Sequence, residues 1–345
     1  MDAASPQTAP PEKRIQEFLA ERYGDRAGEL VVAPLSGDAS TRRYFRLQDG
    51  STTSVLALHP EPFVTEELPF VVIRSLLASW GVPVPELHDH DGARGLLVLE
   101  DLGDLTLQEV LKGASEVERE DLYREAVEGI VILQRETGRG QPKAGCFQIS
   151  FDLEKLSWEL HYFLKHFVET HRRADLSAED RAVVAEAFHR LAEEIASWPR
   201  VLCHRDYHSR NLMLHRGRLW LLDFQDALLG PRQYDLASLL RDSYIALPND
   251  LIDGLLDDYA RLSEHAGRPI GDRAAFRRLF DLVSVQRNLK AAGRFVYIDR
   301  VKHNQNFLPA IPRTLGYVRA NCRRYPELKP LHDLLAPLVP ELAQS

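Results

Sequence analysis

A short polar segment of the chain carries the residues best suited to chemistry. It reads "HRDYHSRN" at residues 204–211, and the apolar run "RLWLLDF" follows it at residues 218–224. Asp206 and Asn211 lie five positions apart in the polar segment, and Asp223 lies near the end of the apolar run. Mg²⁺ prefers oxygen ligands, of which the protein commonly supplies one or two while phosphate and water complete the set. Asn211 and Asp223 therefore fit a magnesium site.

Asp206 has a different chemical role in this pattern. A carboxylate that does not bind the metal can accept the proton of an attacking hydroxyl and hold that hydroxyl in line with a phosphorus atom. The alternative is that all three side chains only cap turns, as polar loop residues often do. Because their spacing and the flanking apolar runs agree, the pattern favours phosphoryl transfer with Asp206 as the catalytic base.

The same segment also allows a zinc site. Cys203 and His204 are adjacent and His208 follows four positions later, and thiolate and imidazole are common ligands of Zn²⁺. The run joins a strand to a loop, and the sequence shows no obvious fourth ligand. Zinc is therefore the weaker interpretation.

Apolar spacing predicts the elements that must position these residues. A helix is expected at residues 14–24, and alternating runs then predict an antiparallel meander between Leu30 and Leu58. A helix that Thr65 caps and two strands around an Asp-Gly turn follow. After Gly103 helical spacing dominates, in particular at residues 118–137, 153–171, 178–198 and 272–297. In this second part, short strands are expected only beside the polar segment.

These elements predict an α+β fold with two lobes, because the chain of 345 residues exceeds one ordinary core. Residues 12–103 are expected to form a small N-lobe with an antiparallel β-sheet. Residues 104–345 are expected to form a larger helical C-lobe that carries the polar segment. Residues 1–11, rich in Ala, Pro and Ser, are expected to be a disordered tail, and a hinge is expected at residues 100–104.

Composition excludes several classes of protein. The chain has 44% hydrophobic and 27% charged residues, as soluble globular proteins do, and no apolar stretch approaches the length of a membrane span. The net charge of -8 argues against a nucleic-acid partner. The N-terminus lacks the apolar core of a signal peptide, and three dispersed cysteines do not suggest a disulfide framework, so a cytoplasmic location is expected. Composition leaves the oligomeric state open.

Several motifs resemble those of the aminoglycoside phosphotransferase family, which is protein-kinase-like. "CHRDYHSRNLM" looks like its catalytic loop, and "LLDFQDALLGPRQYDLASLLRD" looks like its metal-binding segment, in which Gly230 and Asp235 follow Asp223. "GDASTRRYFRL", "LLVLEDLGD" and "VQRNLKAAGRF" extend the resemblance over nearly the whole chain. The resemblance also implies that His204 and Asp235 brace the catalytic loop.

The resemblance implies a protein-kinase-like fold and a set of roles for this chain. ATP and Mg²⁺ are the expected cofactors. Asp206 is the expected base, and Asn211 and Asp223 are the expected Mg²⁺ ligands. The backbone of Glu100 and Leu102 is expected to bind the adenine edge, so that the N-lobe holds the nucleotide.

One departure from the kinase pattern concerns the nucleotide phosphates. The strand "TSVLALHP" has no lysine where kinases place one, and Leu58 or His59 stands near that position. Hydroxyl and guanidinium groups are available instead in the preceding loop, at Ser40, Thr41, Arg42 and Arg43. Strand alternation allows only one of the two adjacent arginines to face the cleft, and the sequence does not decide which.

Six residues are candidate sugar contacts: His208, Arg210, Asp226, Trp158, Arg287 and Asn288. Trp158 and Tyr162 could stack on a sugar ring, although such a pair is more often part of a core. Arg287 and Asn288, together with Lys290, could equally form a solvated helix face, but an arginine would suit a lactyl carboxylate. Asp226 could instead cap a turn, and His208 could instead pack within its loop.

The implied function is that of an ATP- and Mg²⁺-dependent kinase with a small-molecule sugar substrate. The motifs look like the branch of the family that phosphorylates the anomeric hydroxyl of N-acetylmuramate and N-acetylglucosamine in bacterial peptidoglycan recycling. A kinase for an aminoglycoside, homoserine or choline is the first alternative. A pseudokinase-like binding module is the second, because the strand lysine is missing.

Overall fold

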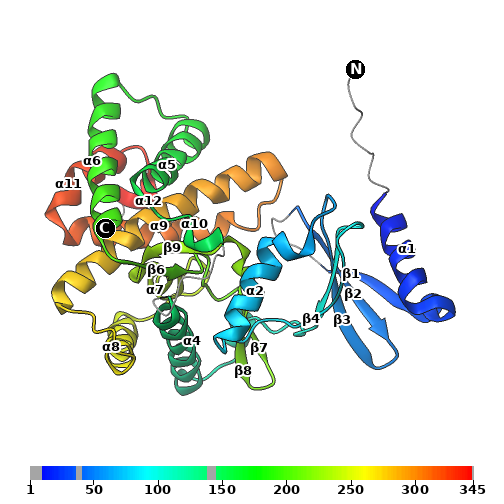
Figure 1. Cartoon of the computed structure of the whole chain (residues 1–345). Helices are drawn as coiled ribbons and strands as arrows, with labels where there is room; N and C mark the ends of the chain where they lie inside the picture. The colour runs from blue at the N-terminus through cyan, green and yellow to red at the C-terminus, as the bar shows by residue number, and fades with distance from the viewer. Residues whose placement is uncertain (1–9, 36–40, 138–144, 344–345) are drawn as a thin grey trace. The chain divides into compact units, whose positions relative to one another are not determined.

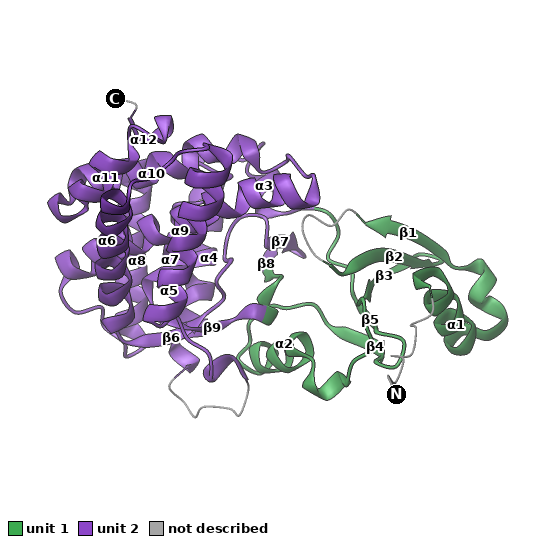
Figure 2. Cartoon of the chain, turned by 90° about the horizontal axis from the view of Figure 1, so that it is seen from above, with its two compact units in different colours: residues 1–104, 220–225 green, residues 105–219, 226–345 purple. Residues whose placement is uncertain are grey.

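The computed structural model of the chain describes residues 10–35, 41–137 and 145–343. The chain divides into two compact units, which Figure 2 shows in different colours. Unit 1 comprises the described residues up to Asp104 together with Trp220–Gln225, and unit 2 comprises the remainder. The predicted α+β fold, with a small β-rich part before a larger helical part, is confirmed.

Unit 1 is built on a five-stranded sheet in which neighbouring strands are antiparallel, in the order β1-β2-β3-β5-β4. The strands are β1 (Val31–Leu35), β2 (Arg43–Asp49), β3 (Thr52–Leu58), β4 (Leu87–Asp91) and β5 (Leu96–Glu100). β2 and β3 form a hairpin in which Gly50 has a φ of 59°, a conformation that glycine adopts without steric cost. The predicted meander and the later strand pair are confirmed.

Helix α1 (Pro11–Tyr23) packs on one face of this sheet (Figure 1). Its apolar side chains recur at helical spacing and therefore share one face. They join a core to which the sheet contributes Phe45, Leu47, Leu56, Leu58, Leu96 and Val98. Since side chains alternate along a strand, the intervening residues of β2 and β3 point away from α1.

Helix α2 (Pro69–Ser79) begins later than predicted. The proline at its first position forces Leu68 into an extended conformation, so the helix cannot start earlier. The hydroxyl of Thr65 lies 3.1 Å from Nδ1 of His90 and does not cap the helix. The prediction that Thr65 is the cap is therefore wrong.

The segment Trp220–Gln225 belongs to unit 1 although it is distant in sequence from the rest of that unit. The ring of Phe224 stacks on Phe70 of α2, with 4.9 Å between the ring centroids. The backbone N–H of Leu221 donates to the carbonyl oxygen of Pro83 at 2.8 Å. These contacts place Asp223 in unit 1. No pattern in the sequence indicates that the chain returns to unit 1 at this point.

Unit 2 is mainly helical (Figure 1). Its helices are α3 (Leu107–Val110), α4 (Glu116–Glu136), α5 (Leu153–Phe163), α6 (Ala178–Ser197), α7 (Gln233–Leu240), α8 (Asn249–His265), α9 (Arg273–Lys302), α10 (Ile311–Arg324), α11 (Lys329–Leu335) and α12 (Pro340–Ala343). The long helix α9 packs against α5, α7 and α10. The four helices predicted by spacing are confirmed, and α5 continues as a π-helix, Leu164–His171. Within the described parts of the chain, no helix is long and apolar enough to span a bilayer.

Four short strands flank the polar segment: β6 (Arg200–Cys203), β7 (Leu212–His215), β8 (Arg218–Leu221) and β9 (Leu228–Pro231). β6 pairs with β9 in antiparallel register, and β7 pairs with β8. β9 was not predicted, because its sequence "LLGP" is short and contains residues that usually interrupt strands. The polar segment is therefore held at both ends by strand pairing.

A close approach between α4 and the polar segment depends on a glycine. The hydroxyl of Tyr207 donates to the carbonyl oxygen of Ala126 at 2.9 Å. A Cβ atom on Gly129, one turn further along α4, would lie 2.5 Å from that hydroxyl oxygen. Because the tyrosine ring is buried, it has little room to move. Gly129 therefore lets Tyr207 anchor the segment to α4.

We expect Gly129→Ala to lower the free energy of unfolding, because the added methyl group displaces the buried tyrosine. Gly254→Ala in α8 is the matched control, since a Cβ there meets nothing within 4 Å. The control is expected to gain up to about 1 kcal/mol, the difference in helix propensity between the two residues. Urea denaturation of both variants tests this, and equal stabilisation of both would contradict the proposed packing role.

Candidate active site

The polar segment at residues 204–211 is held from beneath by a buried carboxylate. Oδ2 of Asp235 on α7 accepts the backbone N–H of His204 at 2.7 Å, and Oδ1 accepts that of Arg205 at 3.0 Å. Burial raises the pKa of Asp235, although the two amides favour its charged form. Arg205 has a φ of 80°, which is unusual for a residue other than glycine. The two bonds fix this strained turn just before Asp206.

A second carboxylate, which the sequence had not marked as a site residue, holds the far end of the segment. Oδ2 of the buried Asp242 accepts the backbone N–H of Ser209 at 3.0 Å. The carbonyl oxygen of Ser209 accepts the N–H of Gln108 at 3.1 Å. In "DLASLLRD" two aspartates lie seven positions apart, one in the first turn of α7 and one just after the helix, and this spacing is the signal that could have revealed the second anchor.

Asp206 lies between these anchors with its carboxylate partly exposed. Its Oδ1 is 3.9 Å from Nζ of Lys290 on α9. Burial would raise the pKa of Asp206, but the positive charge of Lys290, with those of neighbouring basic groups, outweighs burial and holds the pKa well below its usual range. Asp206 is therefore a carboxylate at neutral pH and can accept a proton. Lys290 stood in a candidate stretch, but its contact with Asp206 was not foreseen.

Asn211 is oriented by the same loop. Its Nδ2 donates to the carbonyl oxygen of Asp206 at 2.9 Å, and its backbone N–H donates to that of His208 at 2.9 Å. With the amide nitrogen used in this way, the side-chain oxygen Oδ1 is the atom suited to bind a cation. These hydrogen bonds therefore fix Asn211 relative to Asp206.

Asp223 lies in unit 1, immediately before the short 3₁₀ helix Phe224–Asp226. Its φ of 61° is in the left-handed region, which aspartate tolerates better than most residues. Oδ1 accepts a hydrogen bond from Nε2 of Gln225 at 2.8 Å and lies 3.7 Å from Nη2 of Arg42. A half-exposed carboxylate with a cation beside it suits the binding of charged ligands.

The two adjacent arginines before and in β2 face opposite ways. Arg43 points toward α1, where it is 51% exposed, lies over the ring of Phe45 and pairs with Glu12 at 3.1 Å. Arg42 points to the other face, where its side chain is 16% exposed and lies near Asp223. Strand alternation accounts for the difference. Of the two arginines, Arg42 is therefore the one that lies beside Asp223.

The position of the missing strand lysine has no cation of its own. Leu58 is buried in the core beneath α1. His59 follows β3, and burial, together with the charges of Arg42 and Arg14, lowers its pKa to about 4. His59 is therefore neutral at physiological pH. Of the four phosphate-binding candidates in the preceding loop, Ser40 lies outside the described residues, and Thr41 is exposed next to Arg42.

The segment that follows β5 is fixed by an ion-pair network. Nε of Arg46 lies 2.7 Å from Oδ2 of Asp101, and its Nη2 lies 2.9 Å from Oδ1 of Asp104. Glu100 and Leu102 are both buried, and the N–H of Glu100 donates to the carbonyl oxygen of Glu86 at 2.9 Å. Any contact of Glu100 with a nucleotide would therefore use its carbonyl oxygen rather than its N–H.

The candidate sugar contacts occupy different environments. His208 is partly buried in its loop, and burial lowers its pKa, so the ring is neutral at physiological pH. Arg210 donates to Oε1 of Gln108 at 2.8 Å and lies over the ring of Tyr244 at 3.8 Å. The backbone carbonyl of Asp226 accepts from Arg205 at 3.3 Å.

Two alternatives for the remaining candidates are wrong. Trp158 is 63% exposed and contacts Tyr162, so it is not a core residue, because its face of α5 is not covered. Arg287 and Asn288 do not lie on a solvated helix face, since both are buried. The reason is that α9 is packed on several sides, so that even its polar positions are covered.

The zinc interpretation is also wrong. The described residues contain no group of three or more His, Cys, Asp or Glu side chains arranged to hold a metal ion. Burial raises the pKa of the Cys203 thiol well above its usual range, whereas zinc binds the thiolate. Sγ of Cys203 lies 3.5 Å from the carbonyl oxygen of Pro231. Cys203, like the other two cysteines, is free and buried.

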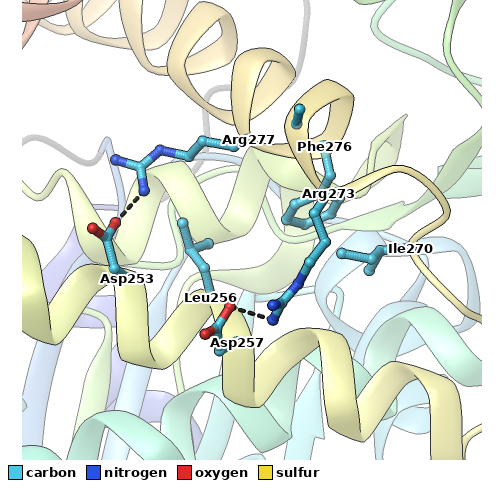
Figure 3. A pocket seen from close by; sticks show the side chains of 8 residues that line it. Asp253, Leu256, Asp257, Ile270, Arg273, Phe276 and Arg277 are labelled. Atoms are coloured by element: carbon cyan, nitrogen blue, oxygen red, sulfur yellow. Dashed lines mark hydrogen bonds and ion pairs between the residues drawn. The ribbon is translucent and has the colours of Figure 1, made fainter.

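A hollow of about 310 Å³ lies elsewhere in unit 2, between α8 and the beginning of α9 (Figure 3). Arg273 pairs with Asp257 across it, and Arg277 pairs with Asp253. None of the residues 204–211 lines it. Because no candidate catalytic or binding residue lines this hollow, it is not the candidate site.

Known structures share the fold. A choline/ethanolamine kinase family protein from Mesorhizobium loti gives a TM-score of 0.59 at 19% identity, over 95% of this chain and 99% of that chain. Aminoglycoside phosphotransferase APH(2'')-Ib, with ADP bound, gives 0.58 at 13% identity, over 88% and 96%. The fold is that of the protein-kinase-like phosphotransferases.

The model of the phosphotransferase enzyme family matches residues 31–275, and the chain belongs to this family. An N-acetylmuramate/N-acetylglucosamine kinase of Neisseria meningitidis is 34% identical over 328 residues, 94% of this chain and 95% of the relative. A protein of the same name from Pseudomonas aeruginosa is 35% identical over 323 residues, 93% and 92% of the two chains. The predicted resemblance is therefore confirmed.

His59 is expected to make part of the stability depend on pH. Its pKa in the folded protein, about 4, lies below the ordinary value of 6.5. Between these two values the unfolded chain binds more protons than the folded protein, so the free energy of unfolding falls as the pH is lowered from about 6.5 to about 4. This contribution is fully present above the ordinary pKa.

We expect the free energy of unfolding to fall less in His59→Gln than in the wild type when urea denaturation at about pH 7 is compared with about pH 4.5. His189→Gln is the matched control, because His189 is exposed on α6. The control is expected to follow the wild type. The prediction fails if His59→Gln shows the wild-type dependence on pH.

Proposed function

We propose that the protein transfers the γ-phosphate of ATP to the anomeric hydroxyl of N-acetylmuramate and N-acetylglucosamine, with Mg²⁺ as cofactor, in peptidoglycan recycling. Similarity over nearly the full length to kinases named for these two sugars carries the proposal. The braced loop with Asp206 and Asn211 supports it, because it supplies an ionised carboxylate beside an oxygen ligand.

The donor atoms fit a magnesium ion. Oδ1 of Asn211 and the carboxylate of Asp223 are hard oxygen ligands of the kind that Mg²⁺ takes from proteins. When bound, the ion supplies positive charge that neutralises the phosphate oxygens of the nucleotide. The adenine edge would bind the carbonyl oxygen of Glu100 and the N–H of Leu102, in a segment that Arg46 holds in place.

In the proposed reaction, Asp206 orients the anomeric hydroxyl and accepts its proton. The sugar oxygen forms a bond to the γ-phosphorus, and the bond from that phosphorus to the β–γ bridging oxygen breaks, so that ADP leaves with the electron pair. An anomeric hydroxyl is more acidic than an ordinary alcohol, so a weakly basic carboxylate suffices. His204 and Asp235 position the loop for this step.

The alternatives fit the site less well. Aminoglycosides and choline are cationic and call for an acidic pocket, whereas Lys290 lies beside Asp206 and Arg287 lies one turn away on α9. A pseudokinase-like module was suggested by the missing strand lysine. Arg42, which faces Asp223, provides a cation in unit 1 and removes the main reason for that alternative.

Asp206→Asn is expected to lower turnover by about 10²-fold or more, the usual scale for a positioned base. ADP release should be measured with Mg·ATP and N-acetylmuramate, N-acetylglucosamine, glucose, kanamycin or choline. The wild type is expected to turn over only the two amino sugars, with the phosphate on the anomeric carbon.

The thermal stability of Asp206→Asn, with and without Mg·ATP, is the control for folding and nucleotide binding. Near-normal turnover by this variant would overturn the assignment of the base. Turnover by the wild type with kanamycin or choline alone would overturn the proposed substrates.

Arg42 is proposed to take the place of the kinase strand lysine at the nucleotide phosphates. Arg42→Gln should therefore lower kcat/KM for ATP by about tenfold or more, the scale of a charged hydrogen bond. Arg43→Gln is the matched control, because it removes the same charge one position away on the face that packs against α1. Equal losses in the two variants would contradict the assignment.

A further inference from the structure

A buried arginine beside the polar segment has two guanidinium nitrogens without a hydrogen-bond partner among the described residues. Arg287 on α9 is 5% exposed, and its Nε and Nη1 make no hydrogen bond to any described residue. Other arginines of unit 2 differ, as Arg278 pairs with Glu194 and Glu327, and Arg277 with Asp253 and Asp281. The proposed phosphoryl transfer does not use Arg287.

Such an arrangement is unfavourable for the protein alone. A guanidinium group remains charged at all physiological pH values, so it cannot escape burial by losing its proton. A buried charge without a partner destabilises the fold, whereas a partner with matching geometry offsets that loss. Guanidinium groups bind carboxylates and phosphates through paired hydrogen bonds. Arg287 is therefore suited to an anionic group that a ligand brings.

The helix geometry places this charge close to the reacting hydroxyl. Arg287 and Lys290 are three residues apart on α9, so they lie on the same face, one turn from each other. Lys290 lies 3.9 Å from Oδ1 of Asp206. The positive charge of Arg287 also acts on Asp206 and on the ring of His208. An anion at Arg287 would therefore belong to the acceptor that Asp206 holds.

The two sugars in the names of the relatives differ in one charged group. N-acetylmuramate carries a lactyl carboxylate on the same ring as its anomeric hydroxyl, and N-acetylglucosamine does not. The nucleotide phosphates already have cations in the proposed site, namely Mg²⁺ and Arg42. We infer that Arg287 forms a subsite for the carboxylate of the acceptor and sets the preference between these sugars.

The inference rests on the proposed function for its two acceptors, and their comparison tests it. In Arg287→Gln, kcat/KM for N-acetylmuramate is expected to fall about 10- to 100-fold, because hydrogen bonds to a charged group are lost. For N-acetylglucosamine it is expected to stay within about twofold, since that sugar has no partner for the charge. Arg287→Lys keeps the charge and should restore part of the preference.

Arg300→Gln is the matched control. Arg300 lies on the same helix, is exposed and contacts His166, so its loss should leave both sugars unaffected. If Arg287→Gln lowers kcat/KM for both sugars equally, or raises KM for ATP instead, Arg287 serves the phosphates or the fold, and the inference is overturned.

Thermal stability provides a readout that does not depend on turnover. Without ligand, Arg287→Gln should be at least as stable as the wild type, because it removes a buried charge whose Nε and Nη1 have no hydrogen-bond partner among the described residues. N-acetylmuramate should raise the melting temperature of the wild type more than N-acetylglucosamine does, and this difference should vanish in the variant. A marked loss of stability in the variant without ligand would show that Arg287 has a structural role and overturn the inference.

If the wild type phosphorylates neither sugar, the proposed function fails. If only the inference about the carboxylate subsite fails, the wild type still turns over both sugars, and Arg287→Gln keeps the wild-type preference between them. The two failures are therefore distinguishable.

Discussion

The carboxylate of Asp235 accepts two successive backbone N–H groups of the polar segment at residues 204–211, and the position of Asp206 in unit 2 depends on this contact. A buried carboxylate is stable only when hydrogen bonds replace the water it has lost. Because both carboxylate oxygens accept a hydrogen bond, they hold Arg205 in its left-handed conformation. This contact fixes the position of Asp206, the next residue. Asp242 and Tyr207 then fix the remainder of the loop to other parts of unit 2.

Each unit places a cation beside one of the candidate carboxylates. Lys290 lies near Asp206 in unit 2, and Arg42 lies near Asp223 in unit 1. Against the effect of burial, Lys290 helps to hold the pKa of Asp206 below its usual range. In the proposed phosphoryl transfer several negative charges come together, so cations at these positions would attract phosphate or carboxylate groups of ligands. The buried Arg287 extends this basic side of α9 by one turn.

Much of the fold was predictable because its elements depend on local patterns. The strands of unit 1 alternate, and the long helices of unit 2 keep an apolar stripe, so both could be recognised in sequence. β9 and the start of α2 were missed for local reasons as well, since "LLGP" has a weak strand pattern and Pro69 restricts the residue before it. The return of Trp220–Gln225 to unit 1 depends on packing of Phe224 that no local pattern encodes.

The sequence by itself determined the types of chemical group at the site, because Asp206, Asn211 and Asp223 fall in recognisable motifs. Only the tertiary structure decided which cations lie beside the carboxylates of Asp206 and Asp223. Arg42 and Arg43 have identical side chains at adjacent positions, and they point to opposite faces of the sheet. Arg287 and Asn288 could have been solvated or buried, and the packing around α9 buried them. Contacts between distant segments carry no local signature, so charge pairing and burial become definite only when the chain is folded.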